Sequence, residues 1–81
     1  MNKRVAVILI NWNSYHHTHN CILSLQDMVY KDFDIILVDN DSKDDSGKKL
    51  AQQHGNGIIF IKSPENLGFA GGNNLGIQYA S

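Results

Sequence analysis

The stretch that most constrains the fold is an unbroken apolar run at residues 35–38, Ile-Ile-Leu-Val, followed directly by Asp39. No polar residue alternates with the apolar ones, so both faces of this strand must be covered, as in a parallel sheet between helices. Residues 42–45, Ser-Lys-Asp-Asp, are of the types that cap helix N-termini. A strand that ends in a carboxylate beside a helix start is a typical ligand-binding position in an open α/β sheet.

Two more apolar runs repeat this pattern, at residues 5–10 and 57–61. Apolar spacing and capping residues predict helices over residues 14–28 and 45–54, and a last helix around Ile77. Strands and helices therefore alternate with short connections. This order predicts an α/β fold with a three-stranded parallel sheet of Rossmann-like topology and strand order 3-2-1. The first two helices would cover one face of the sheet, and the last helix would cover the other.

Polar residues follow each predicted strand, at residues 11–14, 39–44 and 63–74. Parallel strands bring their carboxyl ends to one edge of the sheet, so these loops should meet there and form a binding crevice. Amide, carboxylate and backbone N–H groups in such a crevice suit a nucleotide. The glycines between residues 66 and 76 predict a tight turn where the backbone approaches its surroundings closely.

Composition narrows the classes of function. The chain has 81 residues and a formal net charge of -1, so it lacks the basic patch that a nucleic-acid partner requires. Cys21 is the only cysteine, which excludes an internal disulfide and favours a reducing, cytoplasmic location. The histidines at positions 16, 17 and 19 predict a solvated helix start, because only His16 and His19 have the spacing of metal ligands on a helix.

Three motifs, in order and at the right spacing, are similar to those of a known enzyme family. They are residues 5–13 (VAVILINWN), 35–44 (IILVDNDSKD) and 66–77 (NLGFAGGNNLGI). This pattern resembles the start of family 2 glycosyltransferases of the GT-A fold, most closely the rhamnosyltransferase-like branch. The resemblance covers almost the whole chain. It implies that residues 1–81 form the amino-terminal, nucleotide-sugar-binding part of an incomplete GT-A domain.

The resemblance also implies which residues contact the donor nucleotide. The residues next to the base and ribose would come from the ends of the first two strands, and the remaining nucleotide-binding residues would come from the glycine-rich segment. A buried carboxylate at Asp39 suits the imide N–H of uracil or thymine, or ribose hydroxyls. Position 73 carries asparagine where relatives carry arginine. The nucleotide-binding residues implied in this way are Asn11, Asn13, Asp39, Asp41, Asn73 and Asn74.

The resemblance implies the activity of the full-length enzyme. It would transfer a sugar from a nucleotide-diphosphate donor to a hydroxyl acceptor, a sugar or lipid-linked glycan, by an inverting displacement with Mg²⁺ or Mn²⁺. This chemistry belongs to cell-surface polysaccharide synthesis, in the cytoplasm or at the inner face of the membrane. The family's metal motif and catalytic base come after Ser81, so no catalytic residue or metal ligand is expected in this chain. Residues 39–41 spell Asp-Asn-Asp, but they follow the second strand and not the family's metal position.

Two alternatives stay open. The chain could be a non-catalytic nucleotide-binding or self-assembling module, or an unrelated flavodoxin-like receiver. A receiver would need an acidic cluster after the first strand, where residues 10–13 read Ile-Asn-Trp-Asn. The first strand would also lie at an open, apolar sheet edge. Such edges recruit partners, so we expect a homo-oligomer.

Overall fold

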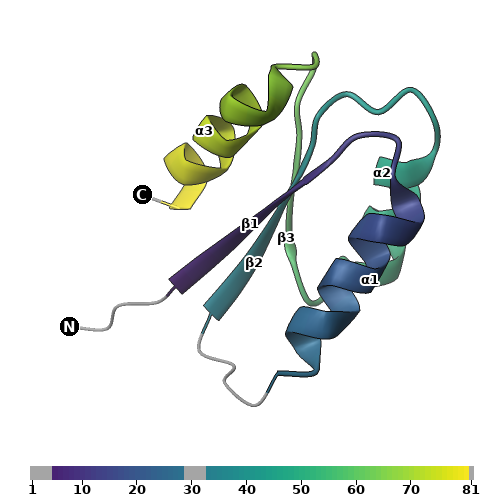
Figure 1. The fold of residues 1–81 in the computed structure, drawn as a ribbon, viewed down its shortest axis with the longest axis vertical. Helices are drawn as coiled ribbons and strands as arrows, with labels where there is room; N and C mark the ends of the chain where they lie inside the picture. Colours follow the sequence, from purple (N-terminus) through teal and green to yellow (C-terminus); the bar gives the residue numbers. More distant parts are fainter. Residues whose placement is uncertain (1–4, 29–32, 81) are drawn as a thin grey trace.

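The computed structural model describes residues 5–28 and 33–80, and these alternate between strand and helix as predicted (Figure 1). The first helix ends at Gln26, two residues earlier than expected. The third strand begins two residues later than expected, at Ile59. The elements are β1 (Val5–Asn11), α1 (Tyr15–Gln26), β2 (Phe33–Asp39), α2 (Ser46–His54), β3 (Ile59–Lys62) and α3 (Gly68–Ala80).

The three strands form one parallel sheet in the order β1-β2-β3, which confirms the predicted fold class and strand order. Figure 1 shows α1 and α2 on one face of the sheet and α3 on the other. The central strand, β2, is buried from Ile35 through Asp39. Its apolar run therefore lies between two helical layers, as the lack of polar alternation predicted.

The core between the sheet and the first two helices is small. Ile22 of α1, Leu37 of β2 and Leu50 of α2 are fully buried and in contact. Leu9, Tyr15, Ile58 and Phe60 pack against this cluster. Because this core is small, polar contacts between the helices and strands must contribute a large part of the stability of the fold. None of the described helices is long and apolar enough to cross a bilayer.

The glycine-rich segment is not the predicted tight turn, because α3 already begins at Gly68 and contains the later glycines, but the predicted close approach of its backbone is confirmed. Among the described glycines, only Gly68 has a positive φ, at 73°. A Cβ on Gly72 would lie 3.0 Å from Cδ1 of Ile10, and one on Gly76 would lie 2.7 Å from Cγ2 of Ile8. These glycines therefore let the helix lie directly on β1. Close packing on the sheet outweighs their low helix propensity.

A pair of histidines joins α1 to α2. Nδ1 of His19 and Nε2 of His54 are 2.8 Å apart, so one ring donates a hydrogen bond to the other. The His19 ring also stacks on Tyr15. Burial, with a smaller effect of His19, lowers the pKa of His54, which favours the neutral form of the His54 ring. His16 and His17 are exposed as predicted, but the expectation of a solvated helix start is wrong for His19, which is half-buried against α2.

Candidate functional site

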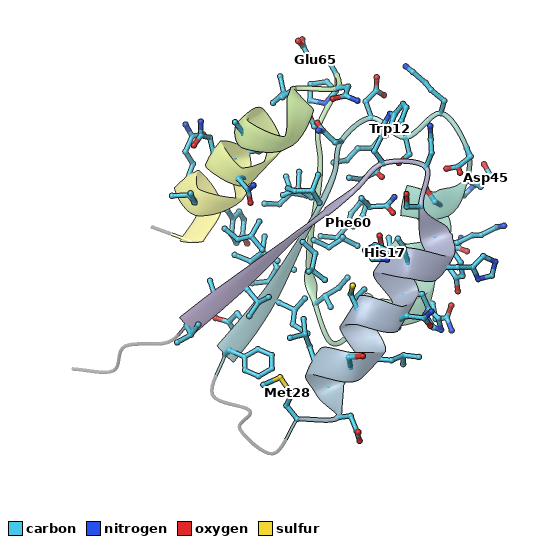
Figure 2. All side chains as sticks on the ribbon, viewed as in Figure 1. Trp12, His17, Met28, Asp45, Phe60 and Glu65 are labelled. Atoms are coloured by element: carbon cyan, nitrogen blue, oxygen red, sulfur yellow. The ribbon has the colours of Figure 1, made fainter. Side chains whose placement is uncertain are left out.

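The carboxyl ends of the three strands lie side by side. In the sheet register Asn11 of β1 pairs with Asp39 of β2, and Asp39 pairs with Lys62 of β3. Figure 2 shows Trp12 and Glu65, from the loops that follow β1 and β3, at the end of the molecule opposite Met28. The predicted meeting of polar loops at one sheet edge is therefore present.

Asp39 is the centre of this edge, with only 2% of its surface exposed. Its Oδ1 accepts hydrogen bonds from Nδ2 of Asn11 at 2.9 Å and from Oγ of Ser42 at 2.6 Å. Its Oδ2 is held less closely, by the backbone N–H of Ser42 at 3.3 Å and by Nζ of Lys62 at 3.5 Å. One carboxylate oxygen is thus committed to the protein, while the other retains capacity to accept a donor.

Asn11 is completely buried and connects four elements. Its Nδ2 lies within hydrogen-bonding distance of Asp39, of Oγ of Ser42 at 3.1 Å and of Oγ of Ser46 at 2.9 Å. Its Oδ1 accepts a hydrogen bond of 2.7 Å from Oγ1 of Thr18. Because these contacts use both ends of the amide, Asn11 acts in this structure by holding Asp39 and the two helices in place.

Asn13 and Asp41 lie in the loops above this centre, and both have positive φ, 51° and 60°. Asparagine and aspartate tolerate this conformation better than other residues with a Cβ. Oδ1 of Asn13 accepts hydrogen bonds from the backbone N–H groups of Lys43 and Asp44, at 2.7 and 3.2 Å. Nζ of Lys43 donates to Oδ2 of Asp41 at 2.8 Å and lowers the pKa of that carboxyl. Both predicted residues thus shape the loop that follows β2.

Asp44 stands one residue before Asp45, the N-cap residue of α2, and supports the start of the helix. Its Oδ1 accepts a 2.9 Å hydrogen bond from the backbone N–H of Ser46, and the hydrogen bonds from Ser46 lower the pKa of Asp44. The side chain of Asp45 itself makes no capping hydrogen bond, so the capping predicted at residues 42–45 is present only as this contact between Asp44 and the first helical residue. Next to the cap, a Cβ on Gly47 would lie 2.4 Å from Cγ of Asp39, so the helix can start here only because this residue is glycine.

Asn40 is the structural residue that sequence reasoning missed. It is 3% exposed, and its amide closes the next loop: Oδ1 accepts from the backbone N–H of Leu67 at 2.9 Å, and Nδ2 donates to the carbonyl of Gly68 at 3.0 Å. These two bonds position the start of α3 above the end of β2. The only sign of this role in the sequence was the position of the Asn40 amide between two carboxylates. The interpretation of that segment concentrated on Asp39 and Asp41.

Asn73 and Asn74 lie within α3 and not on a turn. Asn73 is half-buried and has an interaction partner, whereas Asn74 is exposed. Both therefore lie on the face of the sheet opposite α1 and α2 (Figure 1).

A groove of about 470 Å³ opens beside Asp39, between α2 and β3. Phe60 forms an apolar wall, and Figure 2 shows its ring between the sheet and the first two helices. A second groove, of about 490 Å³, runs along the outer edge of β1 next to Trp12. A hollow of about 360 Å³ lies near Phe33, at the other end of the sheet and away from Asp39. The residues lining the first groove, here called the Asp39 groove, are Asp39, Ser42, Asp44, Gly47, Lys48, Ala51, Gln52, Phe60 and Lys62.

The comparison with protein families identifies the family of this chain. The model of the family described as glycosyl transferase family 2 matches residues 6–81. The chain belongs to glycosyltransferase family 2. No match was found among curated proteins. Family membership and the parallel sheet together agree with the first half of a GT-A domain.

Members of this glycosyltransferase family generally use a divalent cation, but the described residues do not fit one. Within residues 5–28 and 33–80, no three His, Cys, Asp or Glu side chains are grouped to hold a metal ion. The Asp-Asn-Asp run does not converge: Asp39 is held by Asn11 and Ser42, Asn40 holds the start of α3, and Asp41 pairs with Lys43.

Proposed function

We propose that residues 1–81 form the nucleotide-sugar-binding part of a glycosyltransferase domain that transfers a sugar to a hydroxyl acceptor with inversion. In this proposal the enzyme is rhamnosyltransferase-like and acts in cell-surface polysaccharide synthesis. The observation that carries the proposal is the buried Asp39 carboxylate at the sheet edge, with Oδ2 only loosely held beside an open groove. Family membership supplies the class of reaction.

The base of the nucleotide would be recognised at Oδ2 of Asp39. Oδ1 is occupied by Asn11 and Ser42, so the carboxylate is fixed in direction before a ligand arrives. An ionised carboxylate only accepts hydrogen bonds, so it selects a ligand group that donates one. The imide N–H of uracil or thymine meets this requirement, whereas the corresponding ring nitrogen of cytosine is an acceptor. A ribose hydroxyl could use the same oxygen.

The other predicted residues take supporting places in this proposal. Asn13 and Asp41 stand at the rim of the loop after β2 and would contact the ribose. Asn73 and Asn74 would approach from α3. Asn11 acts through Asp39 and does not touch the nucleotide, because it has no exposed surface. Sugar transfer itself would use other groups of the enzyme.

A titration with pyrimidine nucleotides tests the proposal. We expect UDP to shift backbone amide NMR signals of residues around Asp39, and to bind about tenfold or more tightly than CDP, because a hydrogen bond to a charged group contributes about 1.5–3 kcal/mol. Asp39→Asn should remove this preference, while Asp27→Asn, at the far end of α1, should preserve it. Equal binding of UDP and CDP by the unaltered chain would refute recognition of the base at Asp39, and no binding of either would refute the proposed function; neither outcome depends on the folding of a variant.

The open edge of the sheet favours a second candidate function, self-assembly. In the described sheet, β1 has a neighbour only on the β2 side, it carries no charged residue, and Val5 is 53% exposed. We propose that this edge pairs with a second copy of the chain. Sedimentation equilibrium at high micromolar concentration should show a dimer, and Val7→Lys, which adds a charge to the edge, should shift it to monomer. A clean monomer of the unaltered chain would count against self-assembly.

A further inference from the structure

The Asp39 groove contains both signs of charge. Asp39 and Asp44 contribute carboxylates, and Lys48 and Lys62 contribute ammonium groups. A nucleotide diphosphate brings several negative charges into this space, where the carboxylates would repel it. The cationic side chains that line the groove and could pair with the phosphates are Lys48 and Lys62.

Lys62 differs from Lys48 because it is already paired with the carboxylate that the base would use. It is the last residue of β3 and the register partner of Asp39, and its Nζ lies 3.5 Å from Oδ2. That distance exceeds the 2.7–2.9 Å typical of a strong charged hydrogen bond, so the pair is loose. The Lys62 side chain is 61% exposed, whereas Asp39 is 2% exposed. Any rearrangement must therefore come from the lysine.

We propose that Lys62 is an exchangeable counter-ion that selects nucleotides carrying phosphate. In the free chain its ammonium compensates the buried charge of Asp39. When the base of a nucleotide diphosphate donates its N–H to Oδ2, the ammonium leaves Asp39 and pairs with the phosphates. Base recognition and phosphate recognition are thus coupled through one side chain. This inference rests on the proposed function, because it requires the nucleotide to bind at Asp39.

The coupling predicts opposite effects on two ligands that differ only in phosphate. With Lys62→Met, UDP should bind about tenfold more weakly, because an ion pair with the phosphate is lost. Uridine should bind as well as before or a few-fold better, because no ammonium competes for Oδ2. Methionine keeps much of the length and apolar stem of lysine, so the wall next to Phe60 is preserved. NMR titration measures both affinities, and the shift of the Lys62 ammonium group on UDP binding reports the exchange directly.

Lys49→Met is the matched control. Lys49 lies outside the Asp39 groove, where its Nζ stands 5.9 Å from the centre of the Tyr15 ring. The Lys49→Met substitution changes the net charge by the same amount as Lys62→Met. Its UDP affinity should stay within about twofold of that of the unaltered chain at moderate salt, since distant charges are screened. A parallel loss of uridine and UDP affinity in Lys62→Met, or a UDP loss no larger than in the control, overturns the exchange. If the unaltered chain binds no UDP, the proposed function fails, and the exchange fails with it.

Discussion

Replacing Asn11 with alanine is expected to lower the free energy of unfolding by about 3 kcal/mol or more. Asn11 has no exposed surface, and its amide holds Asp39, Ser46 and Thr18 together from three other elements. Its removal leaves a buried carboxylate oxygen and two buried hydroxyls short of partners, and each such loss costs about 1–3 kcal/mol. Urea unfolding followed by circular dichroism measures the change.

A second substitution separates the lost hydrogen bonds from the lost volume. Asn11→Asp keeps the shape of the side chain but replaces the donor next to Oδ1 of Asp39 with an acceptor. We expect Asn11→Asp to lower the free energy of unfolding at neutral pH by at least as much as Asn11→Ala, because two buried carboxylates then face each other. Asn20→Ala, on the exposed side of α1, should change stability by less than about 0.5 kcal/mol. An Asn11→Ala effect as small as this control would contradict the role of Asn11 as a connector.

Gly47→Ala is expected to destabilise the chain by about 2 kcal/mol or more, although alanine is normally the better helix residue by about 1 kcal/mol. The added Cβ would lie 2.4 Å from Cγ of Asp39 and 2.6 Å from each carboxylate oxygen. Asp39 cannot move away cheaply, because Asn11 and Ser42 hold it. The substitution should therefore also weaken UDP binding, which links the stability of α2 to the candidate site.

Two comparisons make this prediction specific. Gly57→Ala places its Cβ 3.1 Å from the end of the flexible Gln26 side chain, so we expect it to cost much less. In an Asp39→Ala background the clash partner is gone, and Gly47→Ala should lose most of its effect, giving a coupling free energy of about 1 kcal/mol or more. Chemical denaturation of the four chains of this cycle provides the value. Additive effects would show that the close contact with Asp39 is not the cause.

Sequence alone was sufficient for the fold class. The apolar run at residues 35–38 has no polar alternation, and a strand of that kind requires cover on both faces whatever its neighbours are. Alternation with helical segments then leaves a parallel sheet with right-handed crossovers as the simple solution. The meeting of polar loops at one edge follows from strand direction, and the family resemblance rests on motifs in the chain itself. Each of these conclusions depends on local pattern or on topology, which sequence contains.

Tertiary structure decided what individual polar and glycine residues do. The sequence pattern of an asparagine after a strand does not distinguish a residue that faces a ligand from one that connects buried elements. Only the register of Asn11 with Asp39, under the start of α2, shows that it connects. Gly72 and Gly76 look like turn residues until α3 is seen lying against Ile8 and Ile10. His19 looks solvated until His54 is opposite it. In each case the deciding partner is distant in the chain, and the burial and contact distance that set the residue's role exist only after the elements have packed.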